Sequence, residues 1–212
     1  VYCPPTRRPA VGLYDRYLAS RIRLAEESLP ETVALIITER DLLEDGAYET
    51  LEAFLDWAFD FGAERIVVYV SVGNEDVIPT LRRELEQIDA PHPISVRSPD
   101  DESRATTPVQ VSIGLGGKHE FAAAVRGIAT AVENGRLDPE EITGEEIERR
   151  LVFPSDPDFI IKTGAERLSD FMIWQSVYSE LYFTDVNWRN FRRRDYLRAL
   201  RDFQRRQRRF GR

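Results

Sequence analysis

Short apolar runs alternate with amphipathic segments along this chain, and that alternation constrains the fold more than any other feature. The runs have the length of β-strands and cover Thr32–Ile37, Arg65–Val70, Pro108–Ile113 and Asp158–Lys162, with a weaker run at Ile94–Arg97. Continuous apolar runs are typical of strands that are buried on both faces. We therefore predict an α/β fold, with a central, mostly parallel β-sheet flanked by helices on both faces.

Segments with helical periodicity lie between these runs, at residues 13–28, 47–61, 76–88, 118–133, 143–150 and 191–209. Thr143 and Glu146 have the spacing of a capping box, which predicts a helix start at 143. The chain contains no internal repeat and no long linker, so we predict a single domain over residues 1–212. Within it, 13–28 is an N-terminal helix and 187–212 is an arginine-rich C-terminal helix with its tail.

Composition excludes several classes of protein. The 212 residues are 42% hydrophobic, which suits one domain with a sizeable core. One cysteine, Cys3, excludes an intrachain disulfide, and with only two histidines it leaves no zinc-binding set. No apolar run approaches the length of a membrane span. We therefore expect a cytoplasmic protein, which could still contact a membrane surface peripherally.

Positive charge is concentrated at the C-terminus of an acidic chain. The formal net charge is −8, yet residues 187–212 contain 11 arginines and only two aspartates. Such a segment would suit nucleic acid. However, its charges lie on a predicted amphipathic helix whose apolar stripe is Leu197, Leu200 and Phe203, and no nucleic-acid-binding motif accompanies them. We therefore expect a solvated helix face and no nucleic-acid partner.

Residues 162–185, called the signature segment below, carry the strongest indication of function. The segment opens with a cationic loop that contains glycine and serine, Lys162–Ser169, directly after a predicted strand. Arg167 can donate two hydrogen bonds to a phosphate, and Ser169 adds a hydroxyl donor. A loop of this kind before a helix would suit a diphosphate, although a solvated turn with a helix cap is the simpler alternative.

The position of this loop in the predicted sheet also matters. Ligands of parallel sheets bind beyond the carboxyl ends of the strands. We therefore expect Lys162 and Thr38, which end two different strands, to lie on the same edge of the sheet. The glycine-rich stretch Gly114–Lys118 lacks the spacing of a phosphate-binding loop, and we expect it to be a tight turn between a strand and a helix.

The signature segment resembles that of the cis-prenyltransferases, the undecaprenyl diphosphate synthase family. The matched residues in order are Thr163, Gly164, Glu166, Arg167, Leu168, Ser169, Phe171, Trp174, Gln175, Tyr178, Glu180, Leu181, Tyr182, Phe183, Thr184, Asp185 and Trp188. Gly116-Gly117-Lys118 looks like the family's G-G-R turn, and Arg209-Phe210-Gly211 looks like its terminal R-x-G.

This resemblance implies a dimer that condenses isopentenyl diphosphate onto an allylic diphosphate with Mg2+. The products would be polyprenyl diphosphates, which become lipid carriers of the undecaprenol or dolichol type. Lys162, Arg167, Leu168 and Ser169 would bind diphosphate, and Glu180 would bind Mg2+. Arg209 and Gly211 would reach across the dimer into the partner's active site.

The chain departs from the family pattern after its first strand. The family has a D-G-N-G-R-W loop there, whose aspartate holds Mg2+, whereas this chain reads Thr38-Glu39-Arg40-Asp41-Leu42-Leu43-Glu44-Asp45-Gly46. Glu39 and Asp41 are the candidate catalytic replacements. Leucines, however, do not give the backbone the freedom that close approach to a phosphate requires. The stretch before Pro108 is also short, and long helices that line the family's product tunnel are not predicted there.

Three functions follow from this combination. The leading hypothesis is a non-catalytic subunit of a heteromeric synthase, similar to the Nogo-B receptor type of subunit. It would act with a homologous catalytic chain, and Mg2+ would be bound in the complex. The first alternative is an active homodimeric prenyltransferase with a shorter product, in which Glu39 or Asp41 replaces the metal-binding aspartate. The second alternative is a binding module for a diphosphate or a nucleic acid, without transferase activity.

Overall fold

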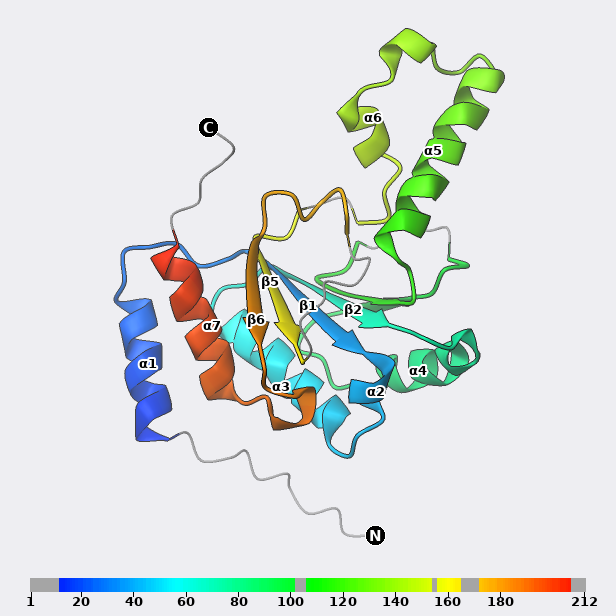
Figure 1. The fold of residues 1–212 in the computed structure, drawn as a ribbon. Helices are drawn as coiled ribbons and strands as arrows, with labels where there is room; N and C mark the ends of the chain where they lie inside the picture. Colours follow the sequence, from blue (N-terminus) through cyan, green and yellow to red (C-terminus); the bar gives the residue numbers. More distant parts are fainter. Residues whose placement is uncertain (1–11, 102–105, 154–155, 165–171, 207–212) are drawn as a thin grey trace.

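The protein forms one parallel β-sheet with helices packed mainly on one side (Figure 1). The computed structural model describes residues 12–101, 106–153, 156–164 and 172–206. The strands of the six-stranded sheet run in the order β3-β4-β2-β1-β5-β6. Their bounds are Thr32–Thr38 (β1), Arg65–Ser71 (β2), Ile94–Arg97 (β3), Val109–Ile113 (β4), Phe159–Thr163 (β5) and Glu180–Thr184 (β6).

Helices connect most of the strands, and the predicted α/β class with a parallel central sheet is confirmed, although the described helices lie mainly on one face rather than on both. The α-helices are Leu13–Arg23 (α1), Glu39–Leu42 (α2), Ala47–Asp60 (α3), Ile78–Leu85 (α4), Gly117–Glu133 (α5), Gly144–Glu148 (α6) and Arg193–Arg205 (α7). Single 3-10 turns cover Glu75–Val77 (η1), Pro139–Glu141 (η2) and Trp188–Asn190 (η3). In the described part of the chain, no helix has the length and apolar character that crossing a membrane requires.

The main core lies between one face of the sheet and the helices α1, α3, α4 and α7. Odd-numbered residues of β1, such as Val33, Leu35 and Ile37, point into this core because side chains alternate along a strand. At its centre the ring of Phe54 lies 6.1 Å from that of Trp188 and 5.4 Å from that of Tyr196, centroid to centroid. This face therefore holds most of the buried apolar surface of the protein.

The opposite face of the sheet, called the second face below, has a smaller core. It consists of Ala34, Ile36, Val67, Tyr69, Leu115, Phe153, Ile160 and Met172. In the described part of the chain, the covering residues Leu115, Phe153 and Met172 come from connecting segments. Helix α5 starts at this face and then extends away from the sheet together with α6 (Figure 1).

The central strand β1 is tied to both of its neighbours. It pairs in parallel with β2 along its whole length and with β5 from Val33 to Ile36. The carboxylate of Asp158, just before β5, accepts hydrogen bonds from the backbone N–H groups of Glu31 and Thr32 at 2.8 and 2.9 Å. The relative height of β1 and β5 is thereby set at their amino ends.

Several local predictions differ from the structure. The helix expected over 13–28 ends at Arg23, where the side chain of Gln204 donates to the carbonyl oxygens of Ile22 and Glu27. The segment 76–88 divides into η1 and α4, and the last helix spans 193–205 rather than 191–209. The helix expected after the cationic loop is absent from residues 172–179, which form turns.

The predicted capping box at Thr143 is wrong. Helix α6 does begin after Thr143, but the threonine side chain makes no capping hydrogen bond. The carboxylate of Glu146 instead forms ion pairs with Arg149 and Arg150. Two nearby guanidinium groups attract this carboxylate more strongly than one neutral N–H group does.

The aromatic cluster gives a test of the main core. Trp188 is fully buried, and its indole N–H donates to the carbonyl oxygen of Ala47 at 3.0 Å. Trp188→Ala should lower the free energy of unfolding by about 3–5 kcal/mol, because it leaves a cavity and an unpaired carbonyl. Urea unfolding measures the loss. Tyr178→Ala, at an exposed aromatic residue, should change stability by less than about 0.5 kcal/mol. Equal losses in both variants would contradict this description.

Candidate functional site

The carboxyl ends of β1 and β5 lie side by side, as predicted for Thr38 and Lys162. Ile36 of β1 is the register partner of Lys162 in β5, and the side chains of both residues lie on the second face. Lys162 is almost completely buried. This edge of the sheet is called the rim below. It therefore holds both the described start of the signature segment and the altered segment after β1.

Lys162 is the buried cation of this rim. Its Nζ lies 3.4 Å from the carbonyl oxygen of Thr163, a long and therefore weak hydrogen bond. Burial lowers the pKa of Lys162, and the nearby carboxylate of Asp41 opposes that shift. A buried ammonium group with so few partners would interact favourably with an anion that reached it. The chemistry of Lys162 thus agrees with the predicted diphosphate-binding role but does not test it.

The segment after β1 is a capped helical turn rather than an open loop. The hydroxyl of Thr38 accepts a hydrogen bond from the backbone N–H of Asp41 at 3.3 Å. The Asp41 carboxylate in turn accepts from the backbone N–H and the hydroxyl of Thr38 at 2.8 and 2.7 Å. This reciprocal capping box fixes the start of α2. It also uses donor groups that an open loop would leave for an anion.

Glu39 has a structural contact as well. One of its carboxylate oxygens accepts hydrogen bonds from the backbone N–H groups of Gly73 and Asn74 at 3.0 and 3.4 Å. These two residues belong to the segment that follows β2. Glu39 therefore links the carboxyl ends of β1 and β2, and both candidate catalytic carboxylates, Glu39 and Asp41, are engaged within the chain.

The described residues contain no set of three or more acidic, histidine or cysteine side chains that could hold a metal ion. Glu180, the predicted Mg2+ ligand, is the first residue of β6 and pairs with Phe159 at the amino end of β5. It lies three residues before the register partner of Lys162, which is about 10 Å along the strand, and its side chain points to the other face. One oxygen of Glu180 is 3.4 Å from Nη1 of Arg206. The described residues of a single chain thus do not fit a magnesium centre.

The second half of the signature segment is held by a buried carboxylate that the sequence did not single out. Glu120 of α5 accepts hydrogen bonds from the backbone N–H groups of Val152 and Phe153 at 2.7 and 3.2 Å. The side-chain amide of Gln175 donates to Glu120 at 3.3 Å and to the carbonyl oxygen of Phe153 at 3.1 Å. Burial raises the pKa of Glu120, against the lowering effect of these donors. Glu120 and Gln175, called the anchor pair below, join the signature segment to α5.

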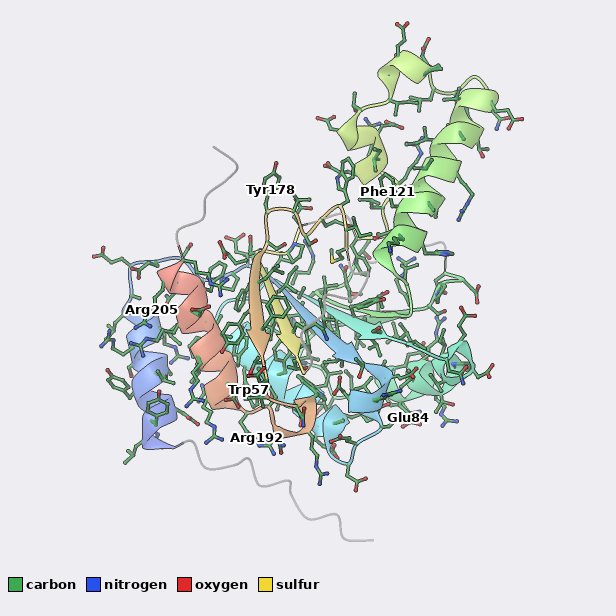
Figure 2. The ribbon with its side chains drawn as sticks, in the orientation of Figure 1. Trp57, Glu84, Phe121, Tyr178, Arg192 and Arg205 are labelled. Atoms are coloured by element: carbon green, nitrogen blue, oxygen red, sulfur yellow. The ribbon has the colours of Figure 1, made fainter. Side chains whose placement is uncertain are left out.

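Trp174 makes a second connection to the same helices. Its ring stacks on Phe121 of α5 at a centroid distance of 5.9 Å, and its indole N–H donates to Glu148 of α6 at 3.2 Å. Figure 2 shows Phe121 at the base of α5, beside the connecting segments above the sheet. The matched tryptophan and glutamine of the family signature are therefore structural in this chain.

Gly117 allows this packing, and it explains the glycine-rich turn after β4. A Cβ atom at Gly117 would lie 2.8 Å from the backbone nitrogen of Ile173 and 3.0 Å from that of Met172. No larger residue fits there unless the backbone shifts. The stretch Gly114–Lys118 is thus a turn that packs against the signature segment, in agreement with the prediction that it is not a phosphate-binding loop.

Four large apolar side chains in the segment 172–184 are exposed: Ile173, Val177, Tyr178 and Phe183. This set is called the edge residues below. Tyr178 points away from the sheet at the turn that precedes β6 (Figure 2). In the described sheet, β6 is an outer strand and pairs only with β5. An outer strand with exposed apolar neighbours is typical of a surface that another chain covers.

Five predicted site residues lie outside the described part of the chain. They are Arg167, Leu168, Ser169, Arg209 and Gly211. Of the predicted site residues that are described, Lys162 lies near Asp41, Glu39 contacts the segment after β2, and Glu180 is at the opposite edge. One signal in the sequence could have indicated Glu120, because it is a carboxylate in the first turn of an alanine-rich helix.

Comparison with known proteins supports the resemblance of the signature segment. Residues 84–211, more than half of the chain, match the Prenyltransf family model, which describes undecaprenyl diphosphate synthases. The tritrans,polycis-undecaprenyl-diphosphate synthase (geranylgeranyl-diphosphate specific) of Methanopyrus kandleri is 34% identical over 253 residues, covering 97% of this chain and 92% of the relative. Because that alignment is longer than the 212 residues of this chain, the relative contains segments with no counterpart here.

A stronger local match is found with the synthase of the same name from Methanocaldococcus jannaschii. It is 53% identical over 109 residues, which span 49% of this chain but only 39% of the relative. Among solved structures, lavandulyl diphosphate synthase from Lavandula x intermedia, in complex with dimethylallyl diphosphate, superposes with a TM-score of 0.68. That match has 24% sequence identity, covers 87% of this chain and 99% of the other, and supports the fold alone.

The close contact at Gly117 gives a test within one helix. Gly117→Ala should destabilise the protein by about 1–3 kcal/mol, because the new methyl group displaces the backbone at Ile173. Gly127→Ala is the matched control, since its Cβ would meet only the flexible side chain of Arg150 at 3.4 Å. The control should stabilise α5 by roughly 0.5–1 kcal/mol. Thermal unfolding distinguishes the two, and equal effects would refute the close contact.

Glu120 predicts a specific pH dependence of stability. Its pKa in the folded state is raised above the ordinary value of 4.5, so its contribution is fully present below pH 4.5 and is lost as the pH rises through the folded pKa. The amide introduced by Glu120→Gln cannot ionise, so this variant should not lose stability as the pH rises. Glu133→Gln, at an exposed position of α5, should keep the decline in stability. Urea unfolding at a series of pH values checks both variants. Parallel stability curves for wild type and Glu120→Gln would contradict the assignment.

Proposed function

Because this chain belongs to the undecaprenyl diphosphate synthase family of prenyltransferases, we propose that it acts in polyprenyl diphosphate synthesis as the non-catalytic subunit of a heteromeric synthase. Its partner would be a homologous chain that retains the D-G-N-G-R-W loop. The substrates of the complex would be isopentenyl diphosphate and an allylic diphosphate, and its product a lipid carrier precursor of the undecaprenol or dolichol type.

The capped turn after β1 is the observation that carries this proposal. Both carboxylates in that turn, Glu39 and Asp41, accept hydrogen bonds from the chain's own backbone. The carboxylate of Asp41, close to the buried Lys162, would repel a diphosphate unless a metal ion lay between them. The described residues provide no three-ligand set for such an ion. A turn built in this way supports a structural role better than a metal-dependent one.

The signature segment supports a role within a complex. Glu120, Gln175 and Gly117 hold the described residues 172–176 in place through buried contacts, and Trp174 adds a half-buried stack on Phe121. A segment that had lost all function would not need this many buried connections. We therefore propose that Lys162, Arg167, Leu168 and Ser169 contribute to diphosphate binding in the assembled enzyme. Arg209 and Gly211 would act in the partner's active site.

The edge residues support contact with another subunit. Val177 and Tyr178 are more than half exposed and directly precede the outer strand β6, Phe183 lies in that strand, and Ile173 lies beside the start of α5. Burial of aromatic and aliphatic side chains supplies much of the energy of protein interfaces. Glu180 begins the same strand, so a partner that covers this edge would also approach it. Mg2+ bound by Glu180 together with partner residues is part of this proposal.

One observation favours the alternative of an active homodimer. Asp41 lies close enough to Lys162 to influence its pKa, so a carboxylate and a cation do meet at the rim. In this alternative Asp41 would leave its capping box and bind a metal ion with the substrate. Asp41→Ala would then abolish transfer by the chain alone. In the proposed function, that variant changes only stability.

A reconstitution experiment tests the proposal. The purified chain, given Mg2+, isopentenyl diphosphate and geranylgeranyl diphosphate, should form no elongated product. The same chain co-purified with a complete homologue should raise the homologue's rate of elongation. Product formation is measured with radiolabelled isopentenyl diphosphate. Robust elongation by this chain alone would refute the non-catalytic role.

Variants of the edge residues test how the subunits meet. Val177→Asp with Tyr178→Asp should weaken association roughly thirtyfold or more, because a charge would be buried in the interface. Leu43→Asp is the control, since Leu43 is also exposed but lies in the turn after α2. Co-purification and the rate of elongation should both fall in the double variant and not in the control. Unchanged association of the double variant would exclude this surface.

A further inference from the structure

Helix α1 is apolar on two opposite sides, although the core needs only one of them. Leu18, Ala19 and Ile22 face inward and are buried. Leu13, Tyr17 and Leu24 follow each other at spacings of four and seven residues, which places them together on the other side of the helix. Leu13 is 85% exposed and Leu24 is 82% exposed. This outward set is called the α1 ridge below.

Helix α7 lies beside α1 and has an outward stripe of a different kind (Figure 1). Its buried side includes Tyr196, Leu200 and Phe203. Its other side contains Arg194, Arg198, Arg201 and Arg205, at spacings of four, three and four residues. These spacings align the four arginines along one side of a helix. They are called the α7 stripe below.

The ridge and the stripe form one surface. The guanidinium group of Arg198 lies 5.8 Å from the centre of the Tyr14 ring on α1. Further along the helices, Arg21 of α1 meets Arg201 and Arg205 of α7 around a surface pocket of about 170 Å³. Figure 2 shows Arg205 beside the end of α1. Arginines thus border the tyrosines of α1: Arg198 lies over Tyr14, and Nη1 of Arg21 donates to the hydroxyl of the ridge residue Tyr17 at 3.2 Å.

The pocket has the electrostatics of an anion site. Glu27 also borders it and opposes a negative charge, but the three arginines exceed this one carboxylate. Arg201 and Arg205 form no hydrogen bond or ion pair with other described residues, so their donors are available. Such a site is unusual in a chain whose formal net charge is −8. Guanidinium groups bind phosphate oxygens through paired hydrogen bonds.

We propose that the α1 ridge and the α7 stripe dock the protein on an anionic membrane surface. The leucines and tyrosines would enter the boundary between headgroups and acyl chains. The arginines would bind headgroup phosphates, one of them in the pocket. This combination of apolar and basic side chains is typical of helices that lie in the plane of a membrane surface.

The exposed leucines distinguish this occupant from two others. A nucleic acid would satisfy the arginines, but it offers nothing that would bury Leu13 and Leu24. A second copy of this chain could present the acidic segment 138–148, but the one large apolar side chain exposed there, Ile142, would not cover both Leu13 and Leu24. A membrane surface offers negative charge and hydrocarbon side by side along the whole length of both helices. The inference does not depend on prenyl transfer, because docking is measured without substrates.

Sedimentation with lipid vesicles tests the proposal. The full chain should bind vesicles of equimolar phosphatidylcholine and phosphatidylglycerol, and not vesicles of phosphatidylcholine alone. Each basic residue near an anionic surface contributes about fivefold to binding. Arg201→Gln with Arg205→Gln should therefore weaken binding roughly twentyfold. The control is Arg83→Gln with Arg126→Gln, which changes exposed arginines on α4 and α5 and has the same net charge as the Arg201→Gln, Arg205→Gln variant. This control should bind vesicles as wild type does.

The α1 ridge needs its own variant. Leu13→Ser with Leu24→Ser should weaken vesicle binding about tenfold. The loss of binding should be larger at high salt, because salt screens the arginines and the apolar contribution then dominates. Leu43→Ser is the matched control on another surface. Circular dichroism confirms that each variant is folded.

Three results would overturn the proposal. The first is equal binding to neutral and anionic vesicles, or no binding to either. The second is binding to an oligonucleotide that exceeds vesicle binding and does not change in the leucine variant. The third is self-association in sedimentation equilibrium that the leucine variant abolishes, with no vesicle binding by wild type.

Discussion

The pairing of β1 with both β2 and β5 is the constraint on which the rest of this structure depends. The backbone groups of a buried strand have no access to water, so each must pair with a neighbouring strand. The register that results places Lys162 beside Ile36, and it places the turn after β1 next to the start of the signature segment. Asp158 fixes this register at the other end, where it accepts hydrogen bonds from Glu31 and Thr32. These contacts place both segments at the rim.

What occupies the rim is decided by hydrogen bonds local to the turn after β1. In a capping box, a side chain and the backbone satisfy each other, which stabilises the first turn of a helix. The same contacts remove the donors and the carboxylate that a metal-bound diphosphate would require. The chain thus combines a signature segment held by buried contacts with a turn that is satisfied within itself. This contrast is the physical basis of the proposed role in a complex.

The protein also has two surfaces that its own fold leaves incomplete. Most of the edge residues lie in or directly before the outer strand β6, whereas the α1 ridge lies beside the arginine stripe of α7. The chemistry of the two surfaces differs, because the first is apolar with little charge and the second mixes leucines with arginines. A protein subunit suits the first surface and an anionic lipid surface suits the second. A synthase of lipid carriers would use both, since its products belong in a membrane.

The sequence alone determined the fold class, the order of the strands along the chain and the family, because apolar runs of strand length and a long matched motif are local properties of the chain. It also predicted that Thr38 and Lys162 share an edge, since parallel strands end on the same side. Only the tertiary structure showed that Glu180 lies at the opposite edge, that Asp41 caps α2, and that Glu120 holds Gln175. Register, the face on which a side chain lies, and the partner of a buried carboxylate depend on residues far apart in sequence. No local pattern of residue types contains that information.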